Sequence, residues 1–264
     1  MEADTITAQS LVTVSYSGRM AQVELNRPSS LNALNLDLLR ELVHALKGMT
    51  VDEKIDMIVL KGSGRGFCSG GDIKSMLEAA DDSSFFSMME VISDLAVTLY
   101  CMPKLTLCAI HGAAAGLGLS IALACDHIIA QADSKIAMNF IGIGLIPDGG
   151  SHFFLERKIG ETKAKELIWE GKVMNAEEAL KRNLIHQITD NLNTAVDQKI
   201  NEWKQKPVSA MIKSKKILAE INRPSLLKIL ELEKHGQLKM RKTHDHQEGI
   251  QAFIEKRPPK FIGK

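Results

Sequence analysis

The sequence lacks the features that mark most specialised classes of protein. Its 33 basic and 32 acidic residues leave a net charge of +1, so no overall electrostatic field draws the chain to nucleic acid or to a membrane surface. Four cysteines, at positions 68, 101, 108 and 125, form no CxxC pair and indicate reduced thiols rather than a disulfide or zinc framework. With 45% hydrophobic and 25% charged residues over 264 positions, the chain is expected to bury a sizeable core.

Targeting and membrane-spanning segments are also missing from the pattern. Residues 1–10 are polar and carry two acids, without the basic start and apolar stretch of an export signal. The most apolar stretch, residues 109–125, contains His111 and several glycines and is shorter than a membrane span. We therefore expect a cytoplasmic protein without membrane contact.

Several familiar catalytic and phosphate-binding motifs are absent. No GxGxxG and no GK[ST] occurs, and residues 66–70 miss the GxSxG pattern of serine hydrolases by one position. Cys68 stays open as a nucleophile, although a buried, inert thiol is favoured because no partner histidine is evident. His244 and His246 lack the i, i+4 spacing of a helical metal site and are predicted to be surface histidines.

The hydrophobic pattern predicts an α/β fold. Alternation over residues 11–16 and 21–25 predicts a β-hairpin. Buried strands are expected at 57–60, 105–110 and 128–130. The first two are followed by a glycine-rich stretch and then a helix.

A helical region is expected after the α/β part. We divide the chain into a core, residues 1–191, and a carboxyl-terminal helical region, residues 192–264. Helices there are predicted to be separated by Pro207 and Pro224, with an apolar stripe made of Met211, Ile212, Ile217, Leu218 and Ile221.

The two glycine-rich stretches are candidate anion sites. Ser69-Gly70-Gly71-Asp72 and Gly116-Leu117-Gly118 each lie where a strand ends and a helix begins, and free N–H groups at helix starts bind negative charge. Two converging N–H groups would form an oxyanion hole, with about 3 kcal/mol of stabilisation per donor. Tight turns that allow close packing explain the glycines equally well, so both interpretations stay open.

Asp148 is the candidate acid. It lies between Ile146-Pro147 and Gly149-Gly150, where apolar surroundings would raise its pKa toward that of a useful base. A simple turn aspartate is the other interpretation, because Pro-Asp-Gly favours a type I turn on its own.

Taken in order, the motifs resemble those of the crotonase superfamily, the enoyl-CoA hydratases and isomerases. The similarity extends over nearly the whole chain and is carried by five segments: residues 26–34 (NRP and LNAL), 67–74 (FCSGGDIK), 111–126 (HG to ACD), 144–147 (GLIP) and 248–257 (EGIQAFIEKR). The resemblance implies a ClpP/crotonase-like spiral of strand, strand and helix units, with carboxyl-terminal helices that form trimers, often paired into hexamers.

The resemblance also implies acyl-CoA thioester substrates, no separate cofactor, and an oxyanion hole formed by the N–H groups of Gly71 and Leu117. The Ser69–Lys74 loop would cradle the adenine end of coenzyme A, with Lys256 or Lys260 of a neighbouring subunit near the phosphates. The residues that we carry over as substrate-binding are Arg27, Cys68, Ser69, Asp72, Ile73, Lys74, Gly116, Ser120, Phe140, Lys256 and Lys260.

Departures from the family pattern favour one reaction. Hydratases use two glutamates, and the corresponding positions here are Ser120 and Phe140, neither of which can transfer a proton. Asp148 falls where the family's double-bond isomerases carry their single acid. We therefore favour isomerisation, with Asp148 as general base and acid.

Three alternatives to isomerisation remain. A hydratase would add water to a 2-enoyl-CoA, and a non-catalytic acyl-CoA-binding protein would keep the fold and the oxyanion hole without turnover. RNA binding is disfavoured because the basic runs at 213–216 and 239–242 are short and typical of solvated helix faces.

Overall fold

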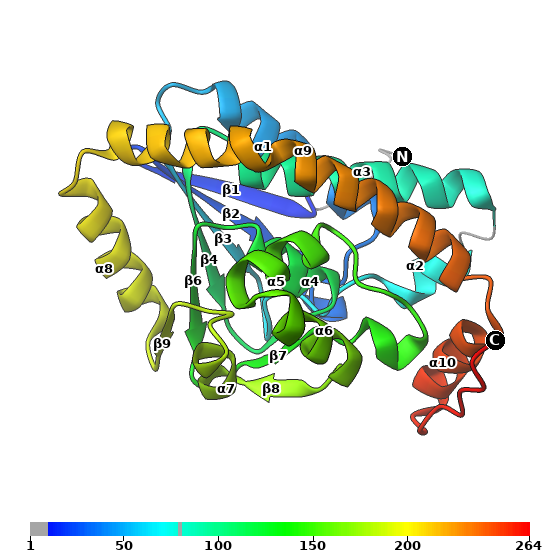
Figure 1. Cartoon of the computed structure of the whole chain (residues 1–264). Coiled ribbons are helices and arrows are strands. Elements are labelled where there is room, and N and C mark those ends of the chain that lie inside the picture. The colour runs from blue at the N-terminus through cyan, green and yellow to red at the C-terminus, as the bar shows by residue number, and fades with distance from the viewer. Residues whose placement is uncertain (1–9, 79–80) are drawn as a thin grey trace, which may run out of the picture.

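A six-stranded sheet forms the centre of the protein. The computed structural model describes residues 10–78 and 81–264 (Figure 1), so the prediction made for residues 1–9 lies outside the described residues. The strands follow one another in the sheet in the order β1 (Val12–Ser17), β2 (Met20–Leu25), β3 (Met57–Gly62), β4 (Leu105–Ile110), β6 (His127–Gln131) and β9 (Gln187–Thr189). The β1–β2 pair is the predicted antiparallel hairpin, and every other pairing in this sheet is parallel.

A second, smaller sheet completes each turn of the chain. It contains β5 (Ala113–Ala115), β7 (Lys135–Ala137) and β8 (Val173–Asn175). Cys68 joins this layer through an isolated bridge to Ala114. The chain therefore repeats a long strand, a short segment of the second layer and a helix, which confirms the predicted spiral.

Helices connect the strands of the two sheets. Those of the first 191 residues are α1 (Leu36–Val51), α2 (Ile73–Glu78), α3 (Asp82–Cys101), α4 (Leu117–Leu123), α5 (Ser151–Ile159), α6 (Glu161–Glu170) and α7 (Ala176–Lys181), with the 3-10 turns η1 (Pro28–Ser30) and η2 (Phe140–Ile143). Helix α1 shows the local logic: the Asn35 side chain accepts a hydrogen bond from Leu38 N at 3.0 Å, and Leu39, Leu42 and Leu46 follow on the buried face.

Both faces of the sheet are covered. All six residues of β4 are buried, which explains its unbroken apolar sequence. Leu107 packs on one face in a cluster with Trp203, from α8 (Leu192–Lys204), while Cys108 and Ile110 belong to the main core on the other face.

One helix of the described residues, α3, is long and apolar enough to cross a membrane by length and composition. In the structure it contacts α1 and α9 (Val208–Met240). Its Met89, Ile92 and Leu95 are buried. The apolarity of α3 therefore has a role in the core.

The carboxyl-terminal helices differ from the prediction at Pro224. This proline lies inside α9, which runs unbroken for 33 residues. A proline removes one backbone hydrogen bond, but α9 packs along α3 and α5. Leu226 and Leu230, just after the proline, are buried, so tertiary packing holds the helix together.

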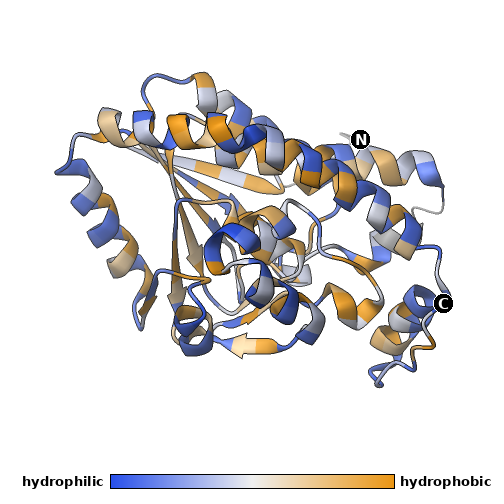
Figure 2. Ribbon diagram, in the orientation of Figure 1, coloured by the Kyte–Doolittle hydropathy of each residue, from blue (hydrophilic) through white to orange (hydrophobic). Residues whose placement is uncertain are grey.

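Part of the predicted apolar stripe on α9 is exposed. Ile217, Leu218 and Ile221 are exposed, Ile221 to 69%. Figure 2 shows apolar (orange) and polar (blue) residues alternating along the ribbon of this helix. The side chains that α9 does bury are Ala219, Leu226, Leu230, Glu233 and Gln237. Two of these five are polar.

Candidate active site

The two glycine-rich stretches meet at one side of the core. In the parallel bridge between Leu34 and Gly71, Leu34 N donates to Gly70 O at 2.8 Å and Asp72 N donates to Leu34 O at 3.0 Å. Gly70 has φ of +101°, and a Cβ there would lie 2.8 Å from Ala115 O. Glycine at position 70 therefore allows the two loops to touch, which is the packing interpretation of the motif.

The same pairing leaves two N–H groups available. In a parallel bridge the flanking residues bond to the partner, so the N–H of Gly71 points away from Leu34. Leu117 is the first residue of α4, where the N–H has no partner within the helix. Within residues 10–78 and 81–264, neither N–H donates a hydrogen bond.

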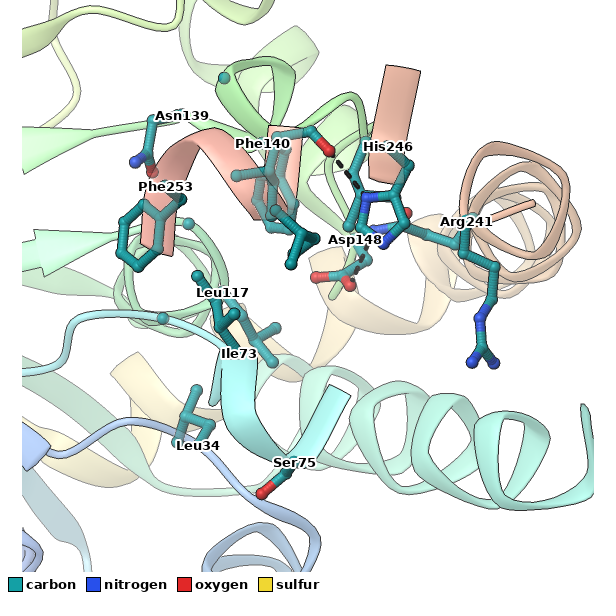
Figure 3. A pocket seen from close by; sticks show the side chains of 18 of the residues that line it. Leu34, Ile73, Ser75, Leu117, Asn139, Phe140, Asp148, Arg241, His246 and Phe253 are labelled. Carbon is teal, nitrogen blue, oxygen red and sulfur yellow. Dashed lines mark hydrogen bonds between the residues drawn. The ribbon is translucent and has the colours of Figure 1, made fainter. Parts of the chain in front are cut away.

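Both residues line a pocket of about 670 Å³. Its walls come from the glycine loops, α3, η2, the Asp148 turn, α9 and α10 (His244–Glu255) (Figure 3). Half of the 28 lining residues have large apolar side chains: Leu34, Ile73, Phe85, Met88, Met89, Ile92, Leu117, Phe140, Ile143, Leu145, Val173, Ile250, Phe253 and Ile254. A pocket of this kind suits a hydrocarbon chain with a few polar groups.

Asp148 lines this pocket and is 7% exposed. Gln237 Nε2 donates to Oδ2 at 3.1 Å, and Oδ1 is buried without a partner among the described residues. Burial, and then the nearby charge of Glu233, raise the pKa of Asp148 to about 7. Ser151 N also donates to Asp148 O at 3.2 Å, so Asp148 begins a turn and has a raised pKa as well. Gly149 and Gly150, the central residues of this turn, have φ of +65° and +82°, so the predicted type I turn is wrong, because type I needs negative φ at both positions.

Glu233 and Gln237 were missed by the sequence analysis. They lie at i and i+4 on α9 and continue the spacing of Leu226 and Leu230 on its buried face. Polar residues at apolar positions of a helical stripe are the signal that could have identified them.

The two positions at which hydratases have glutamates, Ser120 and Phe140, bring no carboxyl group to the pocket. Ser120 is fully buried, where its Oγ donates to Gly116 O and shares a 2.6 Å hydrogen bond with Ser151 Oγ. Ser120 does not line the pocket, whereas Gly116 and Phe140 do.

Some residues predicted to bind coenzyme A line the pocket, and others hold the loops together. Ser69 and Ile73 line the pocket, and Lys74 is exposed outside the lining. Arg27 forms a 3.0 Å ion pair with Asp72 and also donates to Ala33 O at 2.5 Å. These two side chains therefore tie the loops together rather than face the pocket.

Three further candidates lie away from the lining. Cys68 is fully buried, and burial raises the pKa of its thiol to about 12. Its side chain is therefore an inert core group and not a substrate contact. Lys256 and Lys260 are exposed and do not line the pocket of their own subunit.

One histidine prediction is wrong. His244 is exposed, but His246 lines the pocket, where its ring nitrogen Nδ1 donates to Ile143 O at 2.7 Å. Burial lowers the pKa of His246. Among the described residues no group of His, Cys, Asp and Glu side chains is arranged to hold a metal ion.

Comparison with known proteins gives one consistent family. The sequence profile of the enoyl-CoA hydratase/isomerase family matches residues 16–264. YhaR of Bacillus subtilis, named an enoyl-CoA hydratase/isomerase, is 44% identical over 95% of this chain and 98% of its own length. Trans-2-decenoyl-[acyl-carrier-protein] isomerase of Streptococcus mutans is 30% identical over 93% and 95%. The solved enoyl-CoA hydratase of Bacillus halodurans aligns with a TM-score of 0.87 and 28% identity over 92% and 100%.

Proposed function

Because the chain belongs to the enoyl-CoA hydratase/isomerase family, we propose that it moves a carbon–carbon double bond within an enoyl thioester, with Asp148 as the single acid and base. One observation carries this choice. Among the described residues that line the pocket, Asp148 is the sole carboxyl-bearing side chain. Hydration needs a group to deprotonate water and a group to protonate carbon, whereas isomerisation can use one carboxyl for both transfers.

The glycine loops would bind the thioester oxygen. Removal of a proton from the α carbon of a 3-enoyl thioester moves negative charge onto that oxygen. The N–H groups of Gly71 and Leu117, which have no other acceptor among the described residues, would donate to it. Each such donor contributes about 3 kcal/mol when it stabilises developing charge.

Asp148 would carry the proton. With a pKa of about 7, its carboxyl is partly ionised at neutral pH and can act as base and then as acid. The ionised carboxylate takes the α proton, and the carboxylic acid then returns a proton to the γ carbon as the double bond settles between the α and β carbons. The unpartnered Oδ1 is the oxygen that remains available for this transfer.

The substrate would be an acyl-CoA with an apolar chain. The aliphatic and aromatic lining of the pocket supports an apolar chain, as does the name of the Streptococcus mutans relative, which gives a decenoyl chain carried on acyl-carrier protein. We propose that Ser69, Ile73 and Lys74 contact coenzyme A, with Lys256 and Lys260 supplied by a neighbouring subunit. No separate cofactor takes part, since coenzyme A enters as part of the substrate.

The proposal is tested by comparing the wild type with Asp148→Asn on 3-enoyl-CoA and 2-enoyl-CoA. Isomerisation should fall sharply in the variant while acyl-CoA still binds. Isomerisation at the full wild-type rate in Asp148→Asn would rule out this assignment.

Hydration is the second candidate, supported by the hydratase name of the Bacillus halodurans relative. It would release 3-hydroxyacyl-CoA from a 2-enoyl-CoA, and direct measurement of that product separates the two reactions. A non-catalytic acyl-CoA-binding protein is the alternative of another class. It predicts tight thioester binding with no turnover of either substrate.

The assembly and the location of the protein are further proposals. Exposed apolar side chains on α9, including Ile217, Leu218 and Ile221, support association of subunits into a trimer or a hexamer. Sedimentation or light scattering would measure the subunit number. We also propose a cytoplasmic location.

A further inference from the structure

Helix α9 places two polar side chains in a buried layer beside the Asp148 turn. Glu233 is 2% exposed and Gln237 is 3% exposed. Both follow Leu226 and Leu230 along the buried face of the helix. A carboxylate or an amide in such a layer loses its hydration, so apolar residues would fill these positions at lower cost if packing were their whole role.

The Glu233 carboxylate is bound to the turn that follows Asp148. Oε2 accepts a hydrogen bond from Gly150 N at 2.7 Å. Oε1 accepts from His152 N at 3.1 Å and contacts His152 Nδ1 at 2.7 Å. Gly150 and His152 flank the start of α5, so Glu233 fixes the backbone immediately after the Asp148-Gly149 segment.

Gln237 contacts the Asp148 carboxyl itself. Its Nε2 donates to Oδ2 at 3.1 Å, which holds one carboxyl oxygen and leaves Oδ1 unpaired among the described residues. Figure 3 shows the Asp148 carboxyl directed toward the pocket, between the glycine loops and the carboxyl-terminal helices.

We infer that Glu233 and Gln237 are positioning residues for Asp148: Gln237 holds one oxygen of its carboxyl, and Glu233 clamps the turn that carries it. This inference rests on the proposed function, in which Asp148 transfers the proton. It adds that the reactivity of Asp148 is set by a helix more than 80 residues further along the chain, since Glu233 and Gln237 lie 85 and 89 positions after Asp148.

The two residues act on Asp148 in opposite electrostatic directions. The charge of Glu233 opposes ionisation of Asp148 and raises its pKa, whereas the hydrogen bond from Gln237 stabilises the ionised form and lowers it. Other charged or titratable groups near the pocket are Arg241, just after the end of α9, and His246 on α10, and His152 on α5 faces Glu233. Helix α3 contributes only Phe85, Met88, Met89 and Ile92 to the lining.

The experiment compares Glu233→Gln and Gln237→Met in the full-length protein. The acidic limb of the kcat profile for isomerisation follows ionisation of Asp148. Removing the Glu233 charge should move this limb about one pH unit lower, and removing the Gln237 donor should move it to higher pH by a similar amount. A merely structural role predicts loss of stability without limb shifts of opposite sign.

The test has a control variant on the same helix and a second measurement that does not depend on activity. Glu231 lies on the same helix but is exposed and pairs with Lys234, so Glu231→Gln should leave the limb in place. The Asp148 carboxyl can also be titrated directly by ¹³C NMR of aspartate-labelled protein, with Asp148→Asn to assign the signal. If Glu233→Gln does not fold, Gln237→Met and Gln237→Glu still carry the test, because both should raise the pKa of Asp148.

The outcomes separate the two proposals. If the Asp148 signal titrates unchanged in Glu233→Gln and Gln237→Met, the positioning role is wrong, whatever the activity. If the signal shifts as expected but Asp148→Asn retains full isomerase activity, the positioning role stands and the proposed function fails.

Discussion

The two sides of the pocket differ in the groups that they present: main-chain N–H groups on one side (the backbone wall) and a side-chain carboxyl on the other (the side-chain wall). On one side, the N–H groups of Gly71 and Leu117 belong to the main chain and are fixed by the bridge of Leu34 to Gly71 and by the start of α4. On the other side, the Asp148 carboxyl depends on its burial and on side chains of α9. The first wall is therefore sensitive to backbone shape, and the second to charge and pH.

The largest expected effect breaks the side-chain wall. Asp148→Asn removes the group that takes up and returns the proton, so kcat for isomerisation should fall by about 10²- to 10⁴-fold. The amide keeps the shape of the carboxyl and the backbone wall is unchanged, so the Kd for acyl-CoA should stay near the wild-type value. Loss of binding together with activity would indicate instead that Asp148 maintains the pocket.

The next effect breaks the backbone wall. Gly70→Ala introduces a Cβ 2.8 Å from Ala115 O at a φ of +101°, so the two loops must separate and the N–H groups lose their alignment. We expect kcat to fall by about 10²-fold at saturating substrate. Gly48→Ala is the control, because nothing lies within 4 Å of a Cβ there and position 48 is inside α1. An unchanged kcat in Gly70→Ala would contradict the role of the loops.

The third prediction concerns the free energy of unfolding, which should depend on pH because the Asp148 carboxyl is buried. The pKa of Asp148 is raised from 3.8 in the unfolded chain to about 7, so between these values the folded protein binds more protons. Stability should therefore fall as pH rises from about 4 to about 7, by up to about 4 kcal/mol. Urea unfolding of the wild type and Asp148→Asn across this range measures it. A free-energy difference that does not change with pH would mean that Asp148 titrates normally.

The smallest expected effect on rate separates main chain from side chain. Leu117→Ala keeps the N–H donor, so kcat should change by no more than about threefold, although loss of a side chain that is 4% exposed should lower the free energy of unfolding by about 2–5 kcal/mol. Steady-state kinetics and thermal unfolding of the same preparation measure both. A large loss of kcat with normal binding would show that the leucine side chain itself takes part.

The backbone wall was easier to predict from the sequence than the side-chain wall. Glycines that follow a buried strand and precede a helix indicate a close backbone approach. The apolar runs predict the strands of an α/β fold, whereas the spiral was implied by the resemblance to the family. Asp148 was found because the Pro-Asp-Gly-Gly sequence and the family pattern both mark it. Its turn conformation, by contrast, did not exclude a role in the pocket.

The remaining features depend on contacts that local sequence does not specify. Gln237 reaches Asp148, and Glu233 reaches the turn after it, from a part of α9 that lies beyond Pro224, where the sequence predicted a break. The same long-range packing brings His246 to the pocket, and it leaves Ile217 and Ile221 exposed. Helix breaks and apolar stripes read from spacing alone take no account of such packing.

The most direct test of the single-carboxyl proposal follows the hydrogen itself. A 3-enoyl-CoA carrying deuterium on its α carbon is isomerised in ordinary water, and the γ carbon of the product is analysed by mass spectrometry and NMR. Transfer by Asp148 predicts that part of the deuterium reappears on the γ carbon, because the buried carboxyl holds it between the two steps. A γ carbon that takes its hydrogen entirely from solvent, even at the earliest turnovers, would contradict transfer by one carboxyl.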